Sequence, residues 1–93
     1  MLYRIFTENK NYFGLIGLVS AAFEGFTISE CVGYYQGKPE KSLCIEIDHS
    51  SNDVMIEQLC RDICKLNDQQ CVLLEQVDCL SGLINQAGSI KSV

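Results

Sequence analysis

Two stretches of alternating side chains, joined by a short turn, limit what this 93-residue chain can fold into. In residues 26–35 one side is apolar or aromatic: Phe26, Ile28, Val32 and Tyr34. In residues 42–48 one side is aliphatic: Leu43, Ile45 and Ile47. Such alternation is typical of strands that are buried on one side. Gly37 and Pro39 mark a turn over residues 36–40, so the sequence predicts an antiparallel β-hairpin.

The segment before the hairpin has helical spacing. Its apolar residues recur every three to four positions, which predicts a helix over residues 12–24 with Asn9 or Asn11 as a candidate N-cap. Gly14 and Gly17 lower the helical propensity of this segment. They also leave a smooth face that a sheet or a partner could approach closely.

Three further elements complete the pattern. A short aromatic and β-branched stretch predicts a strand over residues 2–6, and another strand is predicted over residues 71–77. Amphipathic spacing predicts a second helix over residues 53–66, with Glu57 and Arg61 placed for an i,i+4 ion pair. The resulting order is β-α-β-β-α-β.

This order predicts a ferredoxin-like α+β sandwich over residues 1–77. Two helices on one face of a four-stranded antiparallel sheet, in spatial order 4-1-3-2, is the simplest way to bury both helical stripes. The predicted core consists of inward-facing apolar residues: Ile5, Leu15, Ile16, Val19, Phe23, Phe26, Ile28, Leu43, Ile45, Ile47, Ile56, Leu59, Ile63 and Leu73. Residues 78–93 form a C-terminal tail outside this domain, and part of the tail could form a short amphipathic helix.

The six cysteines indicate a reducing compartment. The opening residues 1–6 lack the basic and small-residue features of a secretory signal, so we expect a cytoplasmic protein without a disulfide framework. Cys60 and Cys64 lie on one helical face, but no second pair or nearby histidine completes a metal site. We therefore expect reduced thiols that behave as small hydrophobic residues, and no metal or cofactor.

The charge of the chain excludes some partners. Twelve acidic residues against seven basic ones give a net charge of −5, and the basic residues form no cluster. Direct contact with a nucleic-acid backbone or with an anionic membrane surface is therefore not expected. No apolar run is long enough to span a membrane. An acidic surface favours solubility or a basic protein partner.

No group of residues indicates catalysis. His49 is the single histidine, and Asp48 and Ser50 lie on either side of it in the sequence, where adjacent residues at a strand end do not converge on one point. Glu46 and Asp48 share a strand face, which the polar side of a half-buried strand already explains. A cofactor-free isomerase or monooxygenase built on this fold would have His49 as its only candidate acid or base. Because one histidine at a strand end is weak support for such a reaction, we expect a protein that is not an enzyme.

Several short motifs resemble those of small uncharacterised proteins, some of them encoded by phages and other mobile elements. The motifs are Phe23-Glu24-Gly25-Phe26-Thr27-Ile28, Gly33-Tyr34-Tyr35 with Gly37, Glu40-x-Ser42-Leu43-x-Ile45-x-Ile47, and Asn67-x-Gln69-x-x-Val72-Leu73. The chain is also distantly similar to an uncharacterised bacterial family with a glycine-threonine strand, a glycine-aromatic hairpin and a closing Gln-x-x-Val strand. The resemblance covers residues 2–76. It implies the fold and a phage-like origin, and it carries no reaction and no binding residues.

Two classes of function remain. The first is a protein-interaction module, acting as a homodimer or as an inhibitor that docks on a larger basic partner. The resemblance to phage-encoded proteins implies an anti-defence inhibitor as one version of this class, because anti-CRISPR proteins and similar inhibitors are often small, acidic and free of catalytic residues. The second is a dimeric regulatory domain that binds a small molecule between subunits. The expected interface lies on the uncovered face of the sheet and on the tail: Thr27, Cys31, Tyr35, Cys44, Glu46, Leu80, Leu83 and Ile84.

Overall fold

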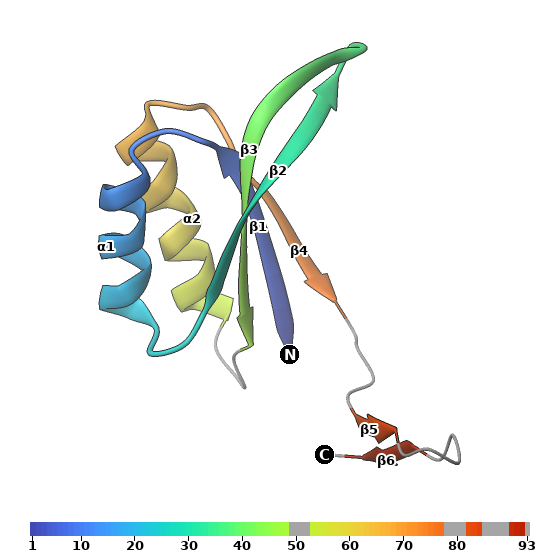
Figure 1. Ribbon diagram of the computed structural model, residues 1–93. Coiled ribbons are helices and arrows are strands. Elements are labelled where there is room, and N and C mark those ends of the chain that lie inside the picture. The colour runs from blue at the N-terminus through green and yellow to red at the C-terminus, as the bar shows by residue number, and fades with distance from the viewer. Residues whose placement is uncertain (49–52, 78–81, 85–89, 93) are drawn as a thin grey trace.

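The computed structural model describes residues 1–48, 53–77, 82–84 and 90–92 of the chain (Figure 1). The helices and strands of the chain begin with the predicted order β-α-β-β-α-β. The elements are β1 (Leu2–Glu8), α1 (Tyr12–Ala22), β2 (Thr27–Tyr35), β3 (Lys38–Asp48), α2 (Asp53–Asn67), β4 (Leu73–Val77), β5 (Gly82–Ile84) and β6 (Ile90–Ser92). Strands β5 and β6 pair with each other in a separate two-stranded sheet. Residues 82–84 are therefore extended, and the helix considered for the tail does not form there.

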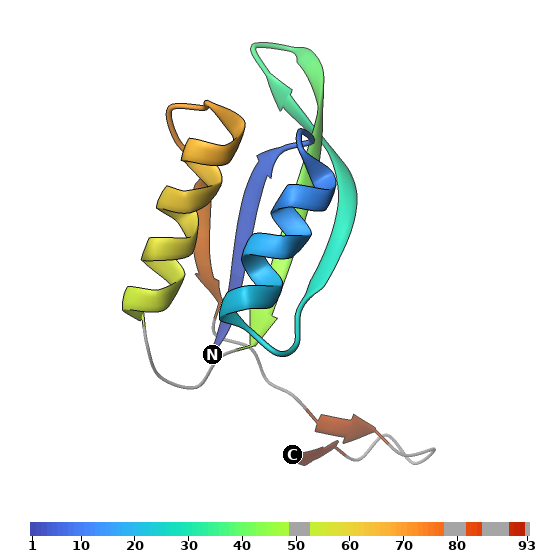
Figure 2. The same cartoon turned by 90° about the vertical axis from the view of Figure 1, so that its left-hand side faces the viewer.

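The main sheet has four antiparallel strands in the order β2-β3-β1-β4, which confirms the predicted spatial order 4-1-3-2. Both helices lie on one face of this sheet, and they are seen side by side in front of it in Figure 2. This arrangement is an α+β fold that is consistent with the ferredoxin-like class. It leaves the other face of the sheet without a covering helix among the described elements.

The core lies between the sheet and the helices. Its members are the inward residues of β1 and β3 and one stripe from each helix: Tyr3, Ile5, Leu15, Val19, Phe23, Leu43, Ile45, Ile47, Ile56, Leu59 and Ile63. Tyr3 was not among the predicted core residues. Phe26 and Ile28 pack against this cluster but are only partly buried.

For two residues, Leu73 and Ile16, the prediction that they belong to the core is wrong. Leu73 is 58% exposed, because it pairs with Phe6 on the uncovered face, whereas Leu74 pairs with Ile5 on the helix side. Ile16 is only partly buried and lies outside the core cluster. The buried residues of α1 are Leu15 and Val19, which are four positions apart and share one side of the helix. Ile16 lies at the border of that side.

The first helix has an unusual N-terminus and composition. Asn11 occupies the N-cap position with a φ of 51° and makes no side-chain capping hydrogen bond. Its Nδ2 instead donates to the backbone oxygen of Leu66 over 3.0 Å, so this residue ties the start of α1 to the end of α2. The helix ends at Ala22, two residues earlier than predicted. Neither α1 nor α2 is long and apolar enough to cross a membrane, within the ranges of the chain that the structure describes.

The hairpin turn is tighter than predicted. Gln36 and Gly37 have φ values of 51° and 76°, and they alone form the turn between Tyr35 and Lys38. Two central residues with positive φ match the twist of the flanking strands, so β3 begins at Lys38 and includes Pro39. Proline is tolerated there because this part of β3 pairs with β2 alone. β1 likewise extends two residues beyond its predicted end, and β4 begins two residues later than predicted.

Candidate interaction surface

An apolar row runs across the uncovered face of the main sheet. The strand registers place Ser29, Cys44, Phe6 and Leu73 side by side on β2, β3, β1 and β4. Cys44 is only 7% exposed and Phe6 is partly buried, while Leu73 is 58% exposed. The row therefore has a buried centre at Cys44 and an exposed aliphatic end at Leu73, on the edge strand β4. We refer to Cys44, Phe6 and Leu73 as the apolar row.

A charged row lies next to the apolar row. The same registers align Thr27, Glu46, Arg4 and Glu75 across the sheet. Arg4 Nε lies 3.5 Å from Glu46 Oε2, and both side chains are partly exposed. Ion pairs of this kind contribute little to stability, so the row mainly gives this surface its charge. Glu46 and Glu75 flank the single cation Arg4, which leaves the row acidic.

Cys44 behaves as an apolar member of this surface. Burial raises the pKa of its thiol, and the nearby carboxylate of Glu46 adds to the effect. A thiol with a raised pKa stays protonated at neutral pH and is a poor nucleophile. Cys44 is therefore a buried and unreactive member of the apolar row.

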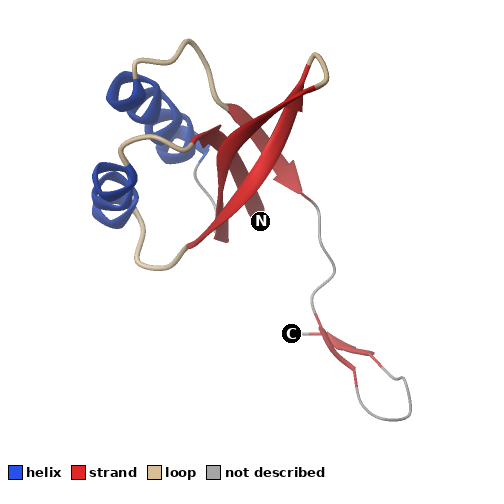
Figure 3. Ribbon diagram, turned by 45° about the horizontal axis from the view of Figure 1, so that its top comes forward, coloured by secondary structure: helices blue, strands red, loops and turns tan. Residues whose placement is uncertain are grey.

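The β2–β3 hairpin extends beyond the rest of the sheet (Figure 3). Pairing between β3 and β1 begins at Ser42 of β3. Residues 38–41 and their partners in β2 therefore have no third strand beside them. Large side chains are exposed on this projection: Val32 60%, Tyr34 74% and Tyr35 67%. By alternation, Tyr35 lies on the same face as the apolar row, and Val32 and Tyr34 lie on the opposite face.

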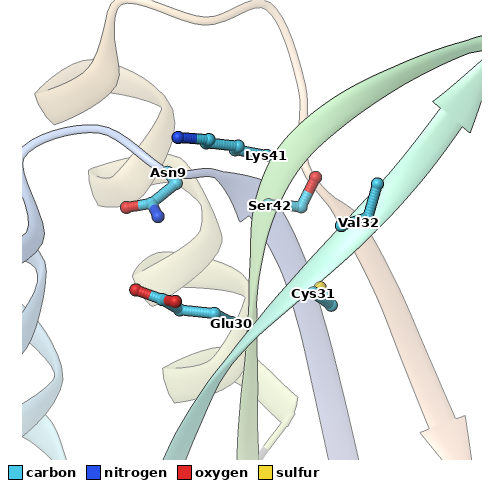
Figure 4. A pocket seen from close by; sticks show the side chains of 6 residues that line it. All are labelled: Asn9, Glu30, Cys31, Val32, Lys41 and Ser42. Atoms are coloured by element: carbon cyan, nitrogen blue, oxygen red, sulfur yellow. The ribbon is translucent and has the colours of Figure 1, made fainter.

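A hollow of about 260 Å³ lies where this hairpin leaves the sheet (Figure 4). Its lining residues are Asn9, Glu30, Cys31, Val32, Lys41 and Ser42. In Figure 4 the side chains of Asn9, Glu30 and Lys41 point toward the helices, whereas Cys31 and Ser42 lie on the other side of the hairpin. A small-molecule site needs polar groups that converge on one point. In this hollow the lining side chains are divided between two sides of the hairpin, so they do not all face one point.

The structure brings five of the expected interface residues to one face. Thr27, Cys31, Tyr35, Cys44 and Glu46 all lie on the uncovered side of β2 and β3. Of the expected residues in the tail, Leu80 lies outside the described residues, and Leu83 and Ile84 lie in β5, which pairs with β6.

Two members of the apolar row, Phe6 and Leu73, were not among the expected interface residues. Phe6 could have been found, since Ile5 was placed in the core and the next residue of a strand points the other way. Leu73 could not, since it stands in an apolar run without alternation.

The other candidate groups do not assemble into a site as far as the structure describes them. His49 lies outside the described residues. Asp48 accepts a hydrogen bond from the N-terminal amine of Met1 over 3.2 Å, and it does not pair with Glu46. No group of three or more metal-ligating side chains occurs within residues 1–48 and 53–77 or the two short strands. Cys60, which lies four residues from Cys64, has a pKa raised to about 11, mainly by burial.

No protein-family model matches the sequence, and no curated protein matches it. The function is therefore inferred from the surface itself.

Proposed function

We propose that this protein acts by contact, as a non-catalytic protein-interaction module that binds through the uncovered face of its sheet. The observation that carries the proposal is the apolar row, whose Leu73 end is 58% exposed beside Phe6. An apolar patch within a polar rim is typical of a protein interface. No described helix or strand covers this face.

The charge around the row indicates the chemistry of the partner. Glu46 and Glu75 flank Arg4 on the neighbouring row, and Asp48 lies on the same face at the end of β3. The chain as a whole carries a net charge of −5. A partner with an apolar centre and a basic rim complements this surface, and opposite charges would also accelerate the encounter.

The sequence resemblance supports a specific version of this role. A small acidic protein that resembles phage-encoded proteins and offers an interaction face is suited to inhibit a larger protein by docking on it. We propose that the partner is a host defence protein, as for anti-CRISPR proteins. The inhibition would require only occlusion of a basic surface.

Purification of tagged protein from its native host tests the proposal. The wild-type chain should retain a protein in a defined stoichiometry, and Leu73→Glu should lose that protein because it places a charge in the apolar row. Val54→Glu is the matched control, since Val54 is also largely exposed but lies on α2, in the layer opposite this face. With the isolated partner, added salt should slow association, because charge steering is screened beyond about 8–10 Å.

Three outcomes would count against this function. Full retention of the partner by Leu73→Glu would show that the partner binds elsewhere. A copurifying small molecule without a protein partner would favour the dimeric regulatory domain. Loss of the inhibitory activity in a folded His49→Ala variant would favour an enzyme.

A further inference from the structure

The outer side of helix α1 is apolar and uncharged. Phe13 is 86% exposed, and Gly17, Ser20 and Ala21 on the same side of the helix are exposed as well. No acidic or basic residue occurs from Tyr12 to Ala22. A helix that is apolar on all sides is normally buried on all sides. In this molecule the sheet and α2 leave one of those sides uncovered (Figure 2).

An apolar groove lies on the same helical layer, between α1 and α2. It has a volume of about 160 Å³ and is lined by Leu18, Ala22, Met55, Gln58, Leu59 and Asp62. The one carboxylate in the lining, on Asp62, accepts a hydrogen bond from Gln58 Nε2 over 3.0 Å. An apolar cavity of roughly 150 Å³ accommodates a benzene molecule. The groove therefore fits one phenyl ring.

We propose that two copies of this chain form a two-fold dimer in which the Phe13 ring of each copy enters the α1–α2 groove of the other. In a two-fold dimer both copies use the same surface patch, so that patch must contain both the ring and the groove that receives the ring of the other copy. Helix α1 meets this requirement, because the ring and the groove residues Leu18 and Ala22 lie on the same element. The axis that exchanges the ring and the groove must pass midway between them.

Gly17 lies at this midpoint along the helix. A Cβ atom built on Gly17 meets no other atom within 4 Å, so this position is open to the outside. The missing side chain allows the two α1 helices to cross there with their backbones close together. Gly14 does not have this role, because its Cβ would lie 3.3 Å from Leu66 Cδ1 of the same chain.

Charge favours a second copy as the occupant. Two chains with a net charge of −5 repel each other over most of their surfaces. The outer side of α1 adds nothing to this repulsion, since the helix has no charged residue. A basic partner would gain no electrostatic attraction at this side of the helix. The dimer also leaves the apolar row free, because the helices and the row lie on opposite faces of the sheet.

Sedimentation equilibrium of the full chain tests the dimer. Wild-type protein should dimerise, and Phe13→Ala should raise the dissociation constant by roughly a hundredfold or more, since two buried rings are lost per dimer. Phe13 lies outside the core, so its substitution should leave the fold unchanged by circular dichroism. Tyr34→Ala removes an exposed aromatic side chain from the hairpin and should leave the dimer intact.

A charge-pairing experiment locates the axis. Gly17→Glu and Gly17→Lys each place like charges next to each other across the axis, so each variant alone should be monomeric. An equimolar mixture of the two should form a heterodimer. A wild-type chain that is monomeric at about 1 mM would overturn the proposal. So would a dimer that survives both Phe13→Ala and Gly17→Glu, or one that Leu73→Glu alone dissociates, because that dimer would use the sheet face.

Discussion

Asn67 donates a hydrogen bond from Nδ2 to Oγ1 of Thr7 over 3.1 Å, although the two residues are 60 positions apart and both are 3% exposed. The same amide nitrogen donates to Gln69 Oε1 over 2.9 Å, and Asn67 Oδ1 accepts from Asn11 Nδ2 over 3.3 Å. One buried amide thus connects the end of β1, the start of α1 and the segment that leads to β4.

Removal of this amide should destabilise the domain more than removal of the hydroxyl. Asn67→Ala removes the hydrogen bonds to Thr7, Gln69 and Asn11 together and should cost roughly 1–3 kcal/mol of unfolding free energy. Thr7→Val should cost less, because Asn67 keeps its bond to Gln69. Urea denaturation of both variants and of the double variant measures the coupling. Strictly additive effects would show that the two side chains act independently.

Two leucines on opposite faces of the sheet provide a matched test of the core. Leu43 is fully buried, so Leu43→Ala should cost about 2–5 kcal/mol. Leu73 is 58% exposed, and Leu73→Ala should change stability by no more than about 0.5 kcal/mol. Thermal or urea unfolding distinguishes the two. Equal losses would mean that Leu73 is covered in the free protein.

The two glycines of α1 should respond differently to alanine. At Gly17 the added methyl group meets nothing, so the higher helical propensity of alanine should stabilise the protein by about 1 kcal/mol. At Gly14 the methyl group would lie 3.3 Å from Leu66, whose side chain must shift, so Gly14→Ala should gain less. Unfolding in dilute solution measures both. A larger gain in stability at Gly14 than at Gly17 would contradict the close approach of α1 and α2 at Gly14.

Alkaline pH should destabilise the protein through Cys60. Burial raises the pKa of this thiol from an ordinary value of 9.0 to about 11. Between these values the unfolded chain loses the proton while the folded chain keeps it, so the unfolding free energy should fall as the pH rises from 9 to 11. The decrease should be smaller in Cys60→Ala. The pH dependence of Cys60 alkylation, followed by peptide mass spectrometry, gives the pKa directly, and a midpoint near 9 would contradict the burial.

Much of this fold could be predicted because its hairpin alternates clearly. Leu43, Ile45 and Ile47 are separated by polar residues or cysteine, which fixes the side of β3 that faces the helices. The run Val72-Leu73-Leu74, which leads into β4, has no such alternation. Only pairing with β1 decides which leucine faces the core, and that pairing joins residues about 70 positions apart in sequence.

The same limit applies to α1 and to the polar network. An 11-residue helix without charge gives no polar side against which to place Ile16, so its partial exposure could not be read from the sequence. Thr7 and Asn67 lie in different elements, and no local pattern connects them. On the candidate surface, alternation indicated the residues of β2 and β3, whereas the contribution of β4 required the register.

The central place of β1 in the sheet has a consequence for synthesis on the ribosome. Its pairing with β3 can form once about 48 residues have emerged, but its other edge is unpaired until β4 follows from residue 73 onward. During that interval the nascent chain presents an unpaired strand edge, which can recruit the strands of other chains. The speed at which the ribosome translates α2 therefore sets how long this edge of β1 is exposed.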